Sequence, residues 1–133
     1  MDNREMKSKV MALGNRLSSR MDRAAAFARA WQIVKAGGLE LSVKGVIFGS
    51  RQEALRRLTR YSPGQVRAFI VPEPENRADR KAAVVMVGVQ NGRGLYRLGY
   101  LPSDFAPGAA SLKAAGLRVI GGDIRGARLA LSV

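Results

Sequence analysis

The chain has 133 residues, enough for one domain with an appendage, and 47% of them are hydrophobic, which argues against general disorder. It contains neither cysteine nor histidine, which excludes disulfide frameworks, thiolate or His-ligated zinc sites, and Ser-His-Asp or Cys-His catalysis. The net charge of +13, carried mostly by arginine, attracts polyanions, of which nucleic acid is the first candidate and anionic lipid a distant second.

The first 38 residues predict two helices. An apolar stripe at helical spacing runs through Met6, Val10, Leu13 and Leu17. This helix is either a frayed arm or a docking element. Asp22 can cap a second helix over residues 23–36, which the glycines at 37–38 end. Its apolar face consists of Phe27, Ala30, Trp31 and Val34. We expect Trp31 to be a buried anchor of this helix rather than a base-stacking platform.

From residue 39 onward the chain reads as short strands joined by turns. Apolar or alternating runs predict strands over residues 39–48, 66–71, 82–89, 95–101, 117–120 and 127–133. Residues 90–94 form a hairpin turn, and further helical turns are expected at 102–106 and 109–115. Ser50 can cap a helix over residues 51–60. In that helix Ala54, Leu55 and Leu58 face inward, whereas a basic ridge is formed by Arg56, Arg57 and Arg60.

This order of elements predicts the fold class. We expect a mainly β protein with helices, in which residues 39–133 form a small six-stranded β-barrel of the OB or SH3-like kind. Residues 1–38 would form an N-terminal helical extension. Residues 1–10 are charged and have no apolar signal core, and no run is apolar enough to span a membrane, so we expect no membrane contact and a cytoplasmic location.

The most informative stretch is the loop between the strands at 66–71 and 82–89. Pro72 and Pro74 stiffen it, while Asn76 and Asp79 can hydrogen-bond the local backbone and turn the chain. A polar loop on a β-scaffold is a common binding site, but Asn76 and Asp79 could also do no more than cap the turn. A metal site is not expected, because the basic residues at 77, 80 and 81 would neutralise the acids beside them.

Three segments in order and at suitable spacing resemble one family, the HIRAN domains. Residues 45–55 resemble the opening strand and Arg-Gln turn of that family. Residues 73–87 resemble its Glu-Pro-x-Asn-x-x-Asp-x-x-Ala-x-x-Val signature, and residues 98–102 its Gly-Tyr/His-Leu-Pro turn. The resemblance covers roughly residues 41–133. It implies a barrel related to OB folds that binds DNA, and a family often fused to helicases or nucleases.

The resemblance also implies roles for particular residues. Asp79 would accept a hydrogen bond from the 3′-hydroxyl of a single strand, Tyr100 would supply a polar ring, and Phe48 would stack a base. The chain departs from the family at Ala78, where the family has an aromatic residue, and at Ile47, where it has a basic one.

The leading interpretation is a non-enzymatic module for single-stranded DNA or DNA 3′ ends, without a cofactor, that could serve a helicase or nuclease partner. The expected DNA-binding residues are Phe48, Arg51, Gln52, Arg57, Asn76, Asp79, Lys81, Arg97 and Tyr100. The alternative is an assembly module acting through the N-terminal helices, and a carboxylate-dependent enzyme is third. One face shared by Arg51, Arg57, Lys81 and Arg97 would favour DNA binding, and scatter would favour assembly.

Overall fold

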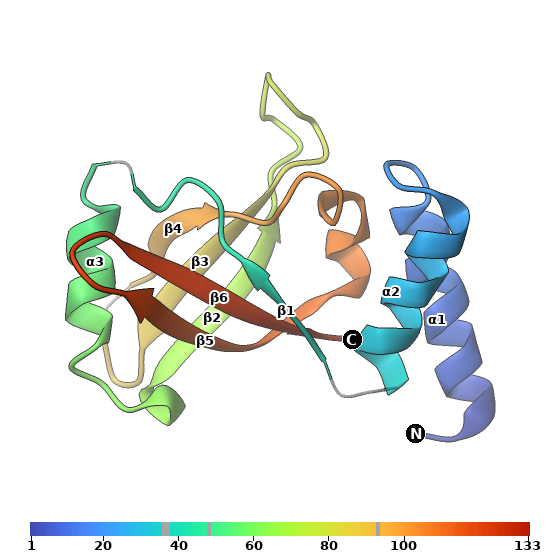
Figure 1. The fold of residues 1–133 in the computed structure, drawn as a ribbon, viewed down its shortest axis with the longest axis horizontal. Coiled ribbons are helices and arrows are strands. Elements are labelled where there is room, and N and C mark those ends of the chain that lie inside the picture. The colour runs from blue at the N-terminus through green and yellow to red at the C-terminus, as the bar shows by residue number, and fades with distance from the viewer. Residues whose placement is uncertain (36–37, 48, 93) are drawn as a thin grey trace.

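The fold consists of helices at both ends of a pair of small sheets (Figure 1). The computed structural model describes residues 1–35, 38–47, 49–92 and 94–133. The helices are α1 (Asn3–Leu17), α2 (Arg23–Lys35) and α3 (Arg51–Leu58), with 3₁₀ turns η1 (Pro63–Gln65) and η2 (Ala106–Ser111). The strands are β1 (Leu39–Ser42), β2 (Val66–Pro72), β3 (Ala83–Val89), β4 (Tyr96–Tyr100), β5 (Lys113–Gly121) and β6 (Arg125–Ser132).

The six strands form two antiparallel sheets of three strands, in the orders β1-β6-β5 and β2-β3-β4. The described strands do not close into a barrel, so the barrel predicted from the sequence is not confirmed. The strand expected over 39–48 is shorter than predicted, because β1 ends at Ser42 and Gly45 turns the chain with φ 79°. Beyond β1, one isolated bridge between Lys44 and Tyr100 joins the segment to β4.

The N-terminal helices share their core with the sheets. The stripe predicted for the first helix is confirmed, since Val10, Leu13 and Leu17 are buried. α1 packs on η2 at Gly108, where an added Cβ would lie 2.9 Å from Leu13 Cδ1 and 3.0 Å from Leu17 Cδ2. One hydrophobic cluster contains residues of α1, α2, α3 and both sheets. Side-chain packing therefore anchors helix α1 to the rest of the protein.

The prediction that Trp31 is a buried anchor is wrong. Trp31 is 38% exposed, and its ring lies beside Lys35, whose Nζ is 5.4 Å from the ring centroid. The buried face of α2 consists of Ala26, Ala30 and Ile33. Gly14 of α1 allows the two helices to approach closely, since a Cβ there would lie 2.7 Å from the half-buried Phe27 ring of α2. The buried face of α2 is thus turned away from Trp31, the largest apolar side chain of the helix.

The remaining elements differ from expectation mainly near the C-terminus. The inward positions of α3 are confirmed, since Ala54, Leu55 and Leu58 are buried. The helical turn expected at 109–115 is wrong in its second half, because β5 begins at Lys113 and pairs with β6 along its length. Residues 113–115 have good helix propensity, but this segment pairs with β6 instead. Tertiary contacts therefore decide the conformation of this segment.

Candidate functional site

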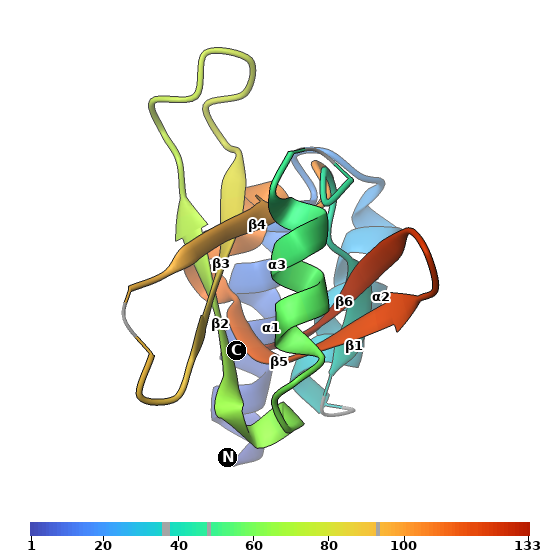
Figure 2. The ribbon, with the colours of Figure 1, turned by 90° about the vertical axis from the view of Figure 1, so that its left-hand side faces the viewer.

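The sheet β2-β3-β4 has one covered face and one open face. α3 lies on the side of the other sheet, as Figure 2 shows, and Tyr96 of β4 lines a hollow with Leu58 and Tyr61 on that side. The opposite face, which we call the outer face, carries two cross-strand rows. One row is Phe69, Met86 and Arg97, and the next is Val71, Val84 and Tyr100.

A register shift brings Arg97 and Tyr100 to the same face. Strict alternation would place residues three apart on opposite faces of a strand. The pairing of β3 with β4 shifts between Val85 and Met86, as at a β-bulge. As a result Arg97 Nη1 donates to the Tyr100 hydroxyl at 3.1 Å. The irregularity therefore places a cation beside an aromatic ring on the outer face.

Glu73, at the end of β2, holds this pair in place. Its Oε1 accepts hydrogen bonds from the Tyr100 hydroxyl at 3.2 Å and from Asn76 Nδ2 at 2.8 Å. Its Oε2 lies 3.0 Å from Arg97 Nη2. The Asn76 hydrogen bond, followed by those of Tyr100 and the charge of Arg97, lowers the pKa of the Glu73 carboxyl below its usual value. The Glu73 carboxylate therefore connects three of the predicted site residues, Asn76, Arg97 and Tyr100.

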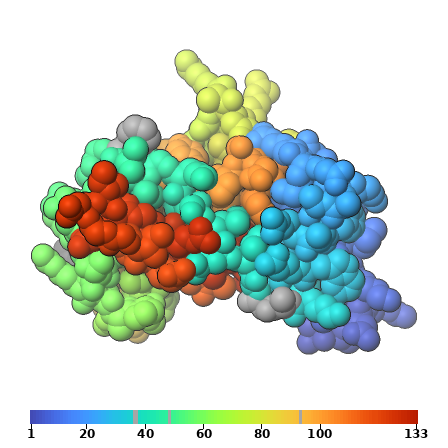
Figure 3. Space-filling view, in the orientation of Figure 1, coloured from blue at the N-terminus to red at the C-terminus, as the bar shows by residue number. Residues whose placement is uncertain are grey.

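The loop of residues 73–82 projects beyond the body of the molecule (Figure 3). Asn76 Oδ1 accepts the backbone N–H groups of Ala78 and Asp79 at 2.9 and 3.0 Å. Asp79 Oδ1 accepts the backbone N–H of Lys81 at 2.9 Å. Both side chains therefore cap the turn, as the simpler interpretation of this stretch predicted.

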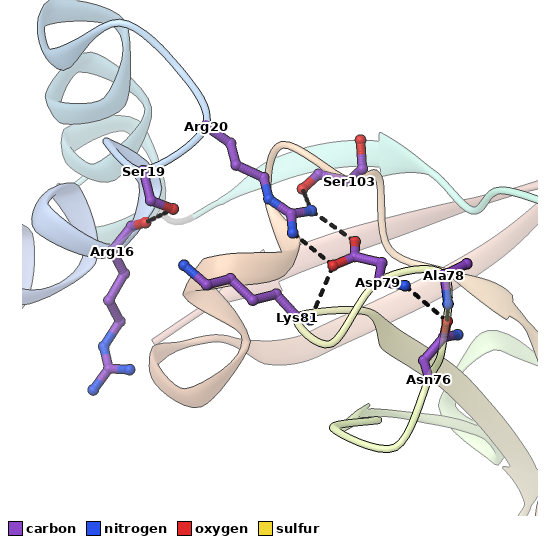
Figure 4. Close-up of polar contacts among 8 residues, drawn as sticks. All are labelled: Arg16, Ser19, Arg20, Asn76, Ala78, Asp79, Lys81 and Ser103. Carbon is purple, nitrogen blue, oxygen red and sulfur yellow. Dashed lines mark hydrogen bonds and ion pairs between the residues drawn. The ribbon is translucent and has the colours of Figure 1, made fainter.

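Asp79 also makes a contact that local sequence could not indicate. Arg20, in the turn between α1 and α2, donates two hydrogen bonds to the Asp79 carboxylate, from Nη1 to Oδ2 at 2.7 Å and from Nη2 to Oδ1 at 2.6 Å (Figure 4). Arg20 Nη1 also donates to the Ser103 carbonyl at 2.9 Å. The hydrogen bonds from Arg20, then that from the Lys81 backbone, lower the pKa of Asp79 to about 2. Asp79 is therefore ionised near neutral pH.

A hollow of about 390 Å³ lies between this loop and the end of β4. Asp79, Tyr100 and the exposed Lys44 line it, together with Ser103 and Asp104. The three hydrogen bonds to Asp79 leave it one of about four acceptor positions, on Oδ2. The hollow thus brings together an acceptor, an aromatic ring, a cation and a second carboxylate, that of Asp104.

Other expected site residues lie elsewhere. Gln52 is a structural link, since its Nε2 donates to the carbonyls of Val46 and Arg125 at 3.0 and 2.7 Å and its Oε1 accepts from the Arg125 backbone N–H at 2.8 Å. Arg51 Nη1 donates to the Gly45 carbonyl at 2.6 Å. Arg57 pairs with Glu53 at 3.0 Å on α3. Phe48 lies outside the described residues.

The four basic residues chosen from the sequence do not share one face. Arg57 lines the α3 side of the sheet, whereas Arg97 lies on the outer face and Lys81 is exposed in the projecting loop. The basic face expected from the sequence is therefore not formed, and this scatter favours the assembly alternative. Sequence inspection missed Arg67 and Phe69, which the alternation of β2 places on the outer face with Arg97. The sequence carried no signal for this, because residues 68–71 are all apolar and the alternation of exposed and half-buried positions appears only in the structure.

Two general features bear on the class of site. Among the described residues, no helix is long and apolar enough to cross a membrane. The same residues contain no group of three acidic, histidine or cysteine side chains placed to hold a metal ion.

Comparisons with protein-family models, with curated proteins and with solved structures find no match to this chain. The resemblance to HIRAN domains therefore rests on the three segments described above.

Proposed function

We propose that this protein is a non-enzymatic DNA-binding module of HIRAN-like type, acting on single-stranded DNA and its 3′ ends. The observation that carries the proposal is the hollow lined by Lys44, Asp79 and Tyr100. Asp79 and Tyr100 belong to two of the three segments that resemble the family, and they are 21 residues apart in the sequence (100 − 79). Their meeting at one concave place supports a common role.

The chemistry of the hollow suits a strand terminus. A carboxylate without a proton is only an acceptor, and a terminal hydroxyl is a donor. Asp79 stays ionised because Arg20 and the Lys81 backbone hold its pKa to about 2, and Oδ2 keeps one acceptor position. Tyr100 is held by Arg97 and Glu73, so its ring is oriented before a ligand arrives. Lys44 supplies a charge for the adjoining phosphate.

The net charge of +13 supplies the long-range attraction to DNA, because a positive protein draws in the phosphates and displaces their counterions. This field favours polyanions in general, and the hollow adds the preference for an end.

A second function, assembly through the N-terminal helices, is favoured by the scatter of the four basic residues and by exposed apolar side chains on α1 and α2. Trp31 on α2 is 38% exposed and Met11 on α1 is 49% exposed, so large apolar side chains face solvent there. Sedimentation velocity would detect self-association through this surface, and Trp31→Ala would abolish it.

The experiment that tests the DNA-binding proposal is fluorescence anisotropy at low salt with three labelled ligands: a single strand, its duplex, and the same strand with a 3′-phosphate. We expect the single strand with a free 3′-hydroxyl to bind tightest. Equal affinity for the free and blocked strands would remove end recognition from the proposal. Absence of binding to all three would overturn the proposal itself.

A further inference from the structure

The outer face of β2 carries exposed side chains that the family resemblance does not include. Arg67, Phe69 and Val71 alternate with the half-buried Val66, Ala68 and Ile70. Phe69 is 42% exposed and Val71 is 43% exposed, although a folded protein normally covers a row of such side chains. An exposed phenyl ring between a guanidinium and an apolar neighbour is a typical arrangement for stacking a base.

A hollow of about 420 Å³ lies beside Phe69, next to the hairpin turn between β3 and β4. Arg67 and Phe69 form one side of it and Leu95 the other, while Gly88 forms the floor. Gly88 keeps the floor low: a Cβ there would lie 3.0 Å from Leu95 Cδ2. None of the described residues that line this hollow is acidic. The Arg67 cation therefore suits a phosphate and the Phe69 ring suits a base, while Gln90 and Asn91 add polar groups to the lining.

The outer face connects this hollow to the one at Asp79. Phe69, Met86 and Arg97 form one cross-strand row, and Tyr100 lies in the next row. Two residues along a strand advance by about 6.6 Å and neighbouring strands are about 4.8 Å apart, so Phe69 and Tyr100 are roughly 12 Å apart on the face. That separation is enough for the two rings to stack different bases of one strand.

We propose that single-stranded DNA crosses the outer face of the sheet β2-β3-β4, with one base stacked on Phe69 and phosphates held by Arg67 and Arg97. The strand would then reach its 3′ end in the hollow at Asp79 and Tyr100. This proposal rests on the proposed function and adds the path of the strand. Arg67 makes no ion pair with a described residue, and Arg97 is paired with Glu73 but keeps a half-exposed side chain. These two cations and the ring of Phe69 match the alternating phosphates and bases of a single strand.

Two pairs of variants test the path by anisotropy with a fluorescein-labelled oligothymidylate of about 16 nucleotides, the upper end of the site size of one small DNA-binding fold. Phe69→Ala is compared with Tyr61→Ala, because Tyr61 is 41% exposed and lies on the α3 side of the sheet. Arg67→Ala is compared with Arg56→Ala, which removes the same charge from an exposed position of α3. Each pair therefore matches exposure or net charge and differs in place.

We expect Phe69→Ala to weaken binding by roughly 5- to 150-fold and Phe69→Tyr to restore most of it, since stacking needs only the ring. Arg67→Ala should lower the slope of log affinity against log salt by about 0.7, and Arg56→Ala by clearly less. Melting curves should show all variants folded. Phe69→Ala and Tyr61→Ala should lower the melting temperature by similar small amounts, because the two rings are exposed to a similar extent.

The outcomes separate this proposal from the function on which it rests. Binding by the wild type that is unchanged in Phe69→Ala and Arg67→Ala would overturn the path and leave DNA binding in place. No binding by the wild type would overturn both. Self-association of the wild type that Phe69→Ala abolishes, with unchanged DNA affinity, would identify the face as a contact between copies and overturn the path.

Discussion

Replacing Leu17 by alanine should destabilise the protein much more than replacing Trp31, although tryptophan is the larger side chain. Leu17 is fully buried and lies against Gly108 of η2, whereas Trp31 is 38% exposed on α2. Leu→Ala at a fully buried site costs the lost transfer free energy and the cavity left behind, about 3–5 kcal/mol. Trp31→Ala removes a side chain that is 38% exposed and leaves a gap open to solvent rather than an enclosed cavity, so we expect a smaller cost of about 1–2 kcal/mol.

The assay is thermal unfolding followed by far-ultraviolet circular dichroism and by tryptophan fluorescence. We expect Leu17→Ala to lower the melting temperature by on the order of 10 °C for a domain of this size. The two probes should give one transition in the wild type, because Ala30, which precedes Trp31 on α2, belongs to the same buried cluster as the sheets. A Leu17→Ala protein that melts like the wild type would refute the shared core. So would a fluorescence transition well below that seen by circular dichroism.

Three further predictions concern the site, acid stability and the link between the sheets. Asp79→Asn should reduce the preference for a free 3′-hydroxyl in anisotropy and leave the salt-dependent background intact; an unchanged preference would restrict Asp79 to capping and to Arg20. The hydrogen bonds from Arg118 and then Arg128 lower the pKa of Glu40 to about 2, so the stability that Glu40 contributes is present above the ordinary value of 4.5 and is lost as pH falls towards 2. Melting curves across that range should therefore fall more steeply for the wild type than for Glu40→Gln, and parallel curves would contradict this. Gly99→Ala should disrupt the bridge between Lys44 and Tyr100 and lower the melting temperature, because its Cβ would overlap the Lys44 carbonyl oxygen and lie 2.8 Å from Val43 Cγ1; a protein that melts unchanged would show that the segment can move aside.

Much of the secondary structure could be predicted because it depends on local pattern. The stripe from Val10 to Leu17 has helical spacing and is buried in α1. The hairpin of β3 and β4 follows from apolar runs on either side of a turn with Asn91, the one described non-glycine residue with a positive φ. The sequence also indicated that Asn76 and Asp79 cap their loop, since short polar side chains bond the nearby backbone.

The geometry of the candidate site could not be predicted in the same way, because it depends on contacts between distant residues. Arg20 and Asp79 are 59 residues apart, and no local pattern pairs them. The register shift beside Met86 puts Arg97 and Tyr100 on one face, whereas simple alternation assigned them to opposite faces. Trp31 was placed inside because Phe27, Ala30 and Val34 share its helical face, but the buried face of α2 consists of Ala26, Ala30 and Ile33.

The most direct test of the account is the salt dependence of wild-type binding to a labelled single strand of DNA. Each phosphate contact to a single strand contributes about 0.7 to the slope of log affinity against log salt, so a handful of contacts predicts a slope of about −3 to −5. We expect measurable binding at low salt with a slope in that range. A flat salt dependence, or no binding at the lowest salt at which the protein stays in solution, would contradict the central claim that this basic protein binds single-stranded DNA.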